Sequence, residues 1–415
     1  MRSTVPGKAT EDEVAEWLKS RAIPLSGLRP GTGISDLAPL RVALDGVRVV
    51  GIGEATHGSR EFFLVRHRLL EFLVEELGFT TIAVEASASA SPAVDDYVRG
   101  GSGDPVEALA GLGFWTLYTA EMLAVVRWLR DHNRTASRKI RFVGIDPQYP
   151  AASLDALRTY LGDEAPGLLG PLAPLAGKRL GVGPPLARRI EADARRVEDR
   201  LTGRAAGSER DEALAHARIV RQSADLASRP FRHPDPAETV SVARDRYLAD
   251  NLDLLLADPN AKVALLAHNG HIMKGSHSGG SVPTMGRHLT QRHGEAYYAL
   301  GVLFGEGEFR ARQPRFGKVN PARPPVTFRV PLVRNSMIVE AHLATAHPGN
   351  HLIDLRGEPR PEAVARWLGE PLRMRSYGGA VARRFTYKLS YMPTVLAEHF
   401  DGIAFVPRTT ASTPL

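Results

Sequence analysis

A glutamate and a histidine lie three residues apart in a glycine-rich turn, where their types and spacing suit proton transfer. The turn follows an apolar run, 48–53, precedes a stretch with helical periodicity, 59–77, and contains Glu54 and His57. In an open α/β sheet, ligands bind in the crevice beyond the carboxyl ends of the strands. The sequence therefore makes Glu54 and His57 candidate general acid–base groups.

Three further apolar runs end on a residue that can do chemistry. The runs and the residues that follow them are 80–84 with Glu85, 140–145 with Asp146 and 263–267 with His268. Short apolar runs bounded by polar turns are typical of buried parallel strands. Because parallel strands end at one edge of a sheet, we expect all four strand-end side chains around one crevice. The sharp turn indicated by Asn269 and Gly270 would leave the His268 imidazole facing that crevice.

Helical periodicity recurs between these runs, at 59–77, 120–132 and 240–257. Strands that alternate with helices predict right-handed βαβ units. We therefore expect the α/β class, as a three-layer α/β/α fold with a mainly parallel sheet. Later apolar runs add strand candidates at 296–303, 326–330, 351–355 and 402–406.

No internal repeat or linker divides the chain. We expect a single α/β domain over 41–415, after an N-terminal helical segment, 1–40.

Residues 150–235 interrupt the alternation of strands and helices. They contain several prolines and two charged amphipathic stretches, near 186–203 and 208–227. We expect a helical insert that shields one face or a lid that covers the crevice, and these two interpretations are compatible. The glycine-rich stretch 275–283 and the proline- and arginine-rich stretch 312–325 are expected to be irregular loops.

The composition is that of an ordinary globular protein, with 43% hydrophobic and 24% charged residues. No apolar run reaches the roughly 18 residues of a membrane helix. Residues 1–13 hold no apolar signal core, so the cytoplasm is the expected location. The chain has no cysteine, which excludes disulfides, thiolate metal sites and a cysteine nucleophile. The net charge is +7, but arginines and acids alternate over 188–200, which is typical of a solvated helix face rather than a nucleic-acid site.

Two common active-site motifs are incomplete. Gly51 and Gly53 resemble the start of a dinucleotide fingerprint, but Thr56 stands where the third glycine is needed. The nucleophile elbow of a serine hydrolase needs a serine between two glycines, whereas His277 has the central position in the similar stretch 275–279. A nucleotide site and a serine hydrolase are therefore not expected.

Two arginines are candidates to balance the carboxylates. Arg66 falls on an otherwise apolar face of its helix, where a buried guanidinium needs an acidic partner. Glu54 or Glu85 would be that partner and would stay ionised beside the guanidinium. In the alternative interpretation, Arg66 lies at the edge of the helix and its guanidinium reaches water. The same argument applies, with less force, to Arg244 near the start of a later helix.

The same residues support more than one chemistry. A neutral imidazole can take a proton from water near neutral pH, and a carboxylate beside it would fix its tautomer. In an ester hydrolase, Arg66, Arg244 or a protonated His268 would stabilise the oxyanion. A binding protein without catalytic activity would use the same crevice with no need for a base. A metallohydrolase would use the possible ligand set Glu54, His57, Glu85 and His268.

Several motifs together resemble the erythromycin esterase family. They are Gly53-Glu54-Ala55-Thr56-His57-Gly58, Arg66, Glu85, Gly144-Ile145-Asp146, Arg244-Asp245, Asn251 and Ala267-His268-Asn269-Gly270-His271, with Trp115, Glu121, Trp128-Leu129-Arg130, Phe400-Asp401-Gly402-Ile403, Thr410 and Pro414. The likeness spans residues 40–415, and the Glu-Ala-Thr-His-Gly and Ala-His-Asn-Gly-His motifs are specific in combination.

The resemblance implies hydrolysis of a lactone or other carboxylic ester in a bulky, macrolide-like molecule, with no metal or other cofactor. The implied catalytic residues are His57 as general base, Glu54, Glu85 and His268, and the implied substrate-binding residues are Arg66, Arg244, Trp115, His271 and Asp146. The expected partner is the small-molecule substrate, without nucleic acid or membrane. Residues 100–118 and 160–235 match no family motif and are expected to shape the pocket. The alternative is a biosynthetic tailoring enzyme of the same family that catalyses cyclisation or acyl transfer.

Overall fold

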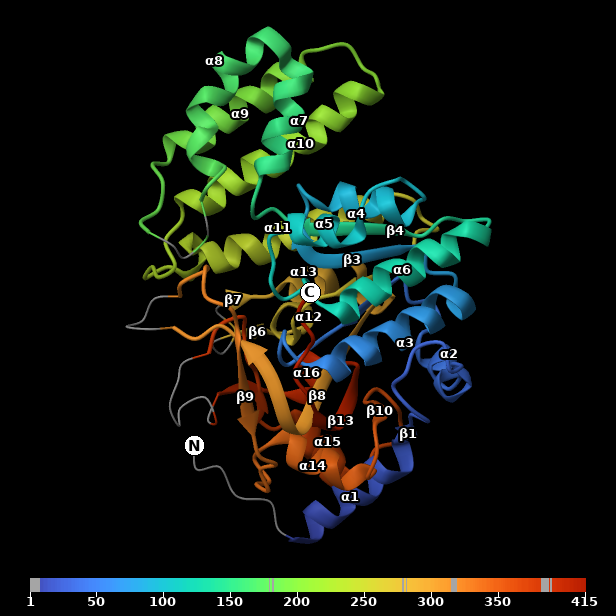
Figure 1. Cartoon of the computed structure of the whole chain (residues 1–415). Coiled ribbons are helices and arrows are strands. Elements are labelled where there is room, and N and C mark those ends of the chain that lie inside the picture. Colours follow the sequence, from blue (N-terminus) through green and yellow to red (C-terminus); the bar gives the residue numbers. More distant parts are fainter. Residues whose placement is uncertain are drawn as a thin grey trace.

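The computed structural model describes residues 8–178, 180, 183–277, 280, 282–314, 319–381, 388 and 390–415. A nine-stranded sheet lies at the centre of the molecule, and helices flank it (Figure 1). Its strands are β1 (Ile23–Pro24), β2 (Val49–Ile52), β3 (Thr81–Ser87), β4 (Arg141–Asp146), β5 (Val263–Leu266), β8 (Tyr297–Ala311), β9 (Val326–Val330), β10 (His351–Asp354) and β13 (Gly402–Thr409). They follow the order β1-β10-β13-β8-β2-β5-β3-β4, and β9 pairs with β8 outside this path.

The strands that carry the predicted site are parallel neighbours. β5 lies between β2 and β3 and is parallel to both, and β4 is parallel to β3 at the sheet edge. β8 and β13 continue the parallel part beyond β2, whereas β1, β10 and β9 join in antiparallel orientation. A register shift between Val84 and Ser87 interrupts the pairing of β3 with β4 at Glu85. The expected α/β class and mainly parallel sheet are confirmed.

The eight predicted strands are all present, with shifts at their ends. β9 has the predicted bounds, and β8 departs most from its predicted end at residue 303. β8 continues to Ala311 because residues 307–311 pair with β9 as an antiparallel ribbon. Gly305 and Gly307 interrupt the apolar run there, so the sequence pattern ends before the strand does.

The helices predicted between these strands are α3 (Arg60–Leu77), α6 (Ala120–Thr135) and α11 (Val240–Leu255). The other helices outside the insert are α2 (Leu40–Ala43), α4 (Ser91–Val98), α5 (Pro105–Gly111), α12 (Asn269–Ile272), α13 (Met285–His293), α14 (Val339–Ala346), α15 (Glu362–Gly369) and α16 (Leu396–His399). Two-stranded pairs form between β6 (Ser276–His277) and β7 (Val282–Pro283), and between β11 (Leu372–Arg375) and β12 (Tyr391–Thr394).

Helix α3 begins directly after the glycine-rich turn and carries Arg66 of the predicted site. Ser59 is its extended N-cap residue, and Gly78 ends it in the left-handed conformation with φ 71°. Glycine adopts this conformation without the strain of a side chain. Phe62, Phe63 and Leu70 bury the apolar face of α3 in the main core.

The N-terminal segment contributes a helix and also a strand to the fold. Helix α1 (Lys8–Arg21) places Trp17 and Leu18 in the same hydrophobic core as the sheet. β1 then pairs with β10 at the sheet edge. A two-residue strand leaves no periodic signal, so the sequence indicated only the helix.

The insert has a hydrophobic core of its own. It comprises α7 (Ala151–Leu161), α8 (Ala165–Leu169), α9 (Arg189–Thr202) and α10 (Ser208–Ser228), so both predicted amphipathic helices are present. Figure 1 shows these four helices together, apart from the central sheet. At the carboxyl end of α10, Gln222 exchanges amide hydrogen bonds with Asn251 of α11, at 2.9 and 3.0 Å. This contact joins the insert to the sheet-flanking layer.

Two predicted loops contain residues outside the described parts of the chain, namely 278, 279 and 281 in the first and 315–318 in the second. Among the helices of the described ranges, none combines the length and the apolar character that crossing a membrane requires.

The C-terminal tail, residues 410–415, lies against the glycine-rich turn and the start of α6. The backbone N–H of Ser412 donates to the carbonyl of Gly58 at 2.9 Å, and the N–H of Arg60 donates to Thr410 at 2.9 Å. Further along, the N–H of Ala120 donates to Thr413 at 2.9 Å. The tail therefore connects two helices whose amino ends border the predicted site.

Removal of residues 410–415 should lower the free energy of unfolding by about 3 kcal/mol, because several hydrogen bonds worth about 1 kcal/mol each are lost. Urea denaturation followed by circular dichroism measures this change. Deletion of Leu415 alone is the control, because this residue is exposed. Coincident unfolding curves for the truncated and full-length chains would contradict the role given to the tail.

Candidate active site

Glu54 and His57 form a hydrogen-bonded pair in the turn after β2. His57 Nδ1 lies 2.7 Å from Glu54 Oε1. A carboxylate only accepts hydrogen bonds, so Nδ1 carries the proton. The basic Nε2 makes no hydrogen bond within the described ranges, and the side chain is 15% exposed. The pair therefore presents one free basic nitrogen to a ligand.

Arg66 holds the Glu54 carboxylate against the ends of two strands. Its Nη1 donates to Glu54 Oε2 at 2.6 Å. Its remaining donors Nε and Nη2 reach three carbonyls at the ends of β2 and β5, those of Ile52, Gly53 and Ala267. Burial lowers the pKa of Arg66, while the negative charges of Glu54 and Glu85 oppose that effect. The acidic partner required by the sequence argument is therefore Glu54.

Glu85 is the centre of a second charged group. Its Oε1 accepts a hydrogen bond from Arg244 Nη2 at 2.8 Å, and its Oε2 accepts from the backbone N–H of His268 at 3.0 Å. Arg244 also donates to the buried carboxylate of Asp146. Burial alone would raise the pKa of Glu85, but the charges of His271 and Arg244 outweigh it and hold the pKa well below its usual range. Glu85 is therefore ionised at neutral pH.

His271 lies beside Glu85 and is held by Asp245. Its Nδ1 is 2.5 Å from Asp245 Oδ1, and its Nε2 is 3.4 Å from Glu85 Oε1. Arg244 Nη1 approaches the same Nε2 to 3.1 Å. Burial would lower the pKa of His271, but the charges of Asp245 and Glu85 raise it to about 10. The imidazolium of His271 is therefore a second cation that supports Glu85.

His268 is a neutral ring between the two charged groups. Its ring centroid lies 5.0 Å from that of His57. Nε2 donates to the carbonyl of Tyr377 at 3.2 Å, and Nδ1 accepts the N–H of Gly270 at 3.1 Å. Burial and the charges of His57 and His271 lower the pKa of His268 to about 3. This corrects the expectation that a protonated His268 stabilises an oxyanion, because both ring nitrogens are already hydrogen-bonded and the ring is uncharged.

Residues 377–381 form a strap across the glycine-rich turn. At one end, the N–H of Tyr377 donates to the carbonyl of Ala55 at 2.8 Å. At the other end, Arg312 donates to Gly379 at 3.0 Å and accepts from Val381 at 2.8 Å. The strap therefore fixes the turn that carries His57 and also sets the tautomer of His268.

A cavity of about 800 Å³ opens above Glu54 and His57. Besides the charged groups, its lining is largely aromatic and apolar, and it comes from distant parts of the chain. The lining residues include Phe114, Trp115, Leu117, Tyr149, Leu180, Phe231, Arg312, Val319 and Gly379. The helical region 150–235 contributes to it through Leu180, Gly183 and Phe231. This volume and lining are typical of a small-molecule site.

Five of the nine expected site residues line this cavity: Glu54, His57, Arg66, Glu85 and Trp115. The other four do not line the cavity: Arg244, His268 and His271 contact Glu85 or His57, and Asp146 contacts Arg244. The Arg244 guanidinium is turned toward Glu85 and Asp146, and Asp146 is fully buried. Arg244 and His271 therefore lie against Glu85 behind the cavity wall, and Asp146 holds Arg244.

The proposed metal ligands have few free donor atoms. Glu54 is bonded to His57 and Arg66, and both nitrogens of His268 are bonded to backbone groups. In the part of the chain that the structure describes, no group of three or more histidine, aspartate or glutamate side chains is arranged so that it could hold a metal ion. A metal ion bound by these residues would have to displace the present partners of Glu54 and His268.

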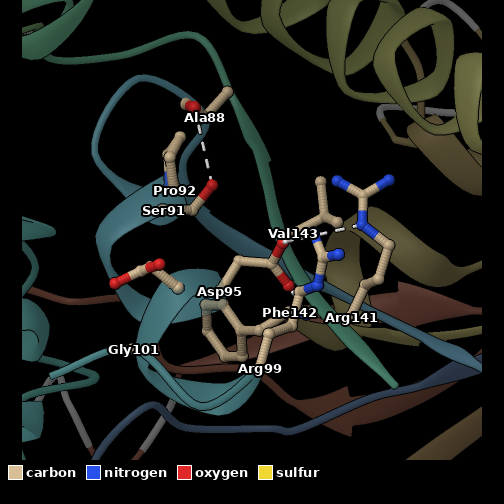
Figure 2. A pocket seen from close by; sticks show the side chains of 10 residues that line it. Ala88, Ser91, Pro92, Asp95, Arg99, Gly101, Arg141, Phe142 and Val143 are labelled. Carbon is tan, nitrogen blue, oxygen red and sulfur yellow. Dashed lines mark hydrogen bonds and ion pairs between the residues drawn. The ribbon is translucent and has the colours of Figure 1, made fainter. Parts of the chain in front are cut away.

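A second cavity, of about 530 Å³, lies at the edge strand β4. Figure 2 shows Asp95 and Arg141 facing one another there, with Arg141 Nε 3.6 Å from Asp95 Oδ2. Asp95 also accepts the backbone N–H of Phe142 at 2.8 Å. Asp95 is thus engaged with Arg99, Arg141 and the strand edge, and the described residues that line this cavity include no histidine.

Sequence reasoning missed most of the residues that line the active-site cavity. Phe114 and Tyr149 meet edge to face, with ring centroids 5.1 Å apart. Tyr149 has a positive φ of 59°, which is uncommon outside glycine. Tyr149 could have been predicted as a lining residue, because it comes soon after Asp146 at the end of a strand. Gly379 and Arg312 left no comparable signal, because their places depend on long-range contacts.

Comparisons with known proteins identify the family of this chain. The erythromycin esterase family model matches residues 74–409. An erythromycin esterase type II from Escherichia coli is 29% identical over 332 residues, which cover 72% of this chain and 79% of the relative. An erythromycin esterase type I from the same organism is 25% identical over 405 residues, which cover 88% and 92%.

Two solved structures share the fold. A succinoglycan biosynthesis protein has a TM-score of 0.81 at 24% identity, covering 98% of this chain and 100% of that one. A histidine-to-asparagine variant of the erythromycin esterase EreC, in its open conformation, has a TM-score of 0.71 at 22% identity, covering 92% and 96%. These likenesses concern the fold alone. The family model, however, spans most of the chain, and the protein therefore belongs to the erythromycin esterase family of ester hydrolases.

Proposed function

We propose that this protein hydrolyses a lactone or related carboxylic ester in a bulky, macrolide-like natural product, with His57 activating water and no metal ion. The hydrogen bond of 2.7 Å between Glu54 and His57, inside a cavity of about 800 Å³, carries the proposal. Curated relatives named erythromycin esterases support the substrate class.

His57 Nε2 is the proton acceptor in the first step. It takes a proton from a water molecule, and the resulting hydroxide attacks the ester carbonyl carbon. The imidazolium then returns this proton to the alkoxide leaving group as the tetrahedral intermediate collapses. Glu54 stabilises the imidazolium and fixes the tautomer, as the acidic member of a catalytic triad does. Arg66 keeps the Glu54 carboxylate in place.

The charge balance of the site favours this proton transfer. The carboxylates of Glu54, Glu85, Asp146 and Asp245 face the cations Arg66, Arg244 and His271. These seven groups, which do not include Arg312 on the cavity wall, together carry one excess negative charge while His57 is neutral. Proton uptake by His57 removes that excess. Glu85 also lines the cavity and is proposed to orient the attacking water.

The oxyanion needs a donor that is not already engaged. The guanidinium groups of Arg66 and Arg244 are bonded to carboxylates and carbonyls. We assign this role to Trp115, which lines the cavity and whose indole N–H makes no hydrogen bond within the described ranges. A well-placed donor of this kind is worth about 3–4 kcal/mol in the transition state.

Incubation with a macrolide panel in ¹⁸O-labelled water should give a ring-opened acid that carries one label, because water attacks the acyl carbon. Mass spectrometry of the product measures the incorporation. Turnover of a pathway intermediate without label, on an unaltered panel, would contradict hydrolysis and favour cyclisation or acyl transfer.

His57→Ala should lower kcat/KM by about 100-fold or more, because the general base is removed. Steady-state kinetics on the substrate identified by the panel measures this loss. His132→Ala, at the far end of α6, is the matched control and should retain activity. Near-normal turnover of a folded His57→Ala variant would remove His57 from the mechanism.

Activity should survive prolonged dialysis against EDTA, because the carboxylates and His268 are bonded to protein groups rather than free for a metal. Elemental analysis should find less than stoichiometric zinc, manganese or iron. Stoichiometric metal, together with activity that is lost on chelation and restored on re-addition, would establish the metallohydrolase instead.

A further inference from the structure

Gly379 faces the space between the proposed base and the proposed oxyanion donor. A Cβ atom built on Gly379 would lie 3.7 Å from Trp115 Nε1 and 4.0 Å from His57 Cδ2. Gly379 also belongs to the lining of the active-site cavity. A side chain at this position would therefore enter the region where the carbonyl carbon of an ester must sit.

The backbone on both sides of Gly379 is held in place. Tyr377 pairs with Thr56 in the glycine-rich turn, and Ala380 pairs with Arg312 at the end of β8. Hydrogen bonds of 2.8 to 3.0 Å accompany both pairings. A side chain at residue 379 could not leave the cavity without breaking one of these contacts.

Neither backbone conformation nor packing requires glycine at this position. Gly379 does not have a positive φ, and the two atoms near its virtual Cβ are at ordinary van der Waals distance. The backbone here would therefore accept a Cβ atom, in contrast with Gly58, whose virtual Cβ would lie 2.1 Å from the carbonyl oxygen of Arg310. What the absent side chain provides is space above His57.

We propose that Gly379 is a specificity-determining residue. It admits esters whose acyl group is part of a ring and is branched at the carbon next to the carbonyl, the chemical class to which macrolide lactones belong. The inference rests on the proposed function, because it assumes that His57 and Trp115 flank the reacting carbonyl. The bare backbone lets a bulky acyl group lie between the strap and His57. A side chain at 379 limits the site to small, unbranched acyl groups.

Four variants test this assignment: Gly379→Ala, Gly379→Val, Gly378→Ala and Gly378→Val. Gly378 is the matched control, because it is exposed and nothing lies within 4 Å of its virtual Cβ. Two p-nitrophenyl esters with the same leaving group, the acetate and the branched 2,2-dimethylpropanoate, report on acyl size. Thermal unfolding of each variant checks the fold.

The ratio of kcat/KM for the branched ester to that for the acetate should fall at least about tenfold in Gly379→Val, the scale of discrimination by one or two methyl groups in a pocket. Gly379→Ala should show a smaller fall, and both Gly378 variants should keep the wild-type ratio. An unchanged ratio in a folded Gly379→Val variant would overturn the proposal.

A second measurement separates this inference from the proposed function. Diethyl pyrocarbonate acylates accessible imidazole nitrogens, and peptide mass spectrometry resolves the reaction at His57 from that at other histidines. His57 should react more slowly in Gly379→Val than in the wild type and the Gly378→Val control, whatever the natural substrate is. If His57 is labelled slowly in Gly379→Val but the wild-type protein cleaves no ester, the steric role of Gly379 is supported and the proposed esterase activity is refuted. Equal labelling in Gly379→Val and wild type would refute the steric role itself.

Discussion

The buried ion pair between Arg66 and Glu54 is the interaction on which both the fold and the site depend. One guanidinium joins helix α3, the carboxyl ends of β2 and β5, and the carboxylate that holds His57. Loss of one partner of such a pair leaves an uncompensated buried charge, at a cost of about 3–5 kcal/mol. The position of the proposed base is therefore coupled to the stability of the sheet that carries it.

A second layer of charge supports the first without lining the cavity. Arg244 and His271 keep Glu85 ionised, and each of these two cations is held by an aspartate. Burial between these groups keeps His268 neutral, so its ring is a spacer that is fixed by hydrogen bonds. Two histidines of one site thus differ in charge, because His271 faces carboxylates and is protonated, whereas His268 faces backbone groups and is neutral.

The cavity above this charged base is built from segments that lie outside the βα units. The helical insert, the loop with Trp115, the strap and the end of β8 all contribute to its lining. Loops that a rigid sheet positions can vary without disturbing the core. Within the family, we therefore expect the strand ends to determine the chemistry and these segments, including Gly379 beside the base, to determine which ester is accepted.

The sequence by itself determined the local features: the eight main strands, the helices between them, and the polar residues at the strand ends. Hydrophobic periodicity and strand-end chemistry are local, so they can be read without coordinates. Only the tertiary structure decided that Arg66 pairs with Glu54 rather than Glu85 and that His268 is neutral while His271 is charged. It also decided that Tyr377 contacts Ala55 and His268 and that Gly379 faces His57. These outcomes depend on burial, on hydrogen-bond partners and on contacts between residues more than 300 positions apart, such as Ala55 and Tyr377. No local pattern encodes such contacts, because they arise when distant segments pack against the same sheet edge.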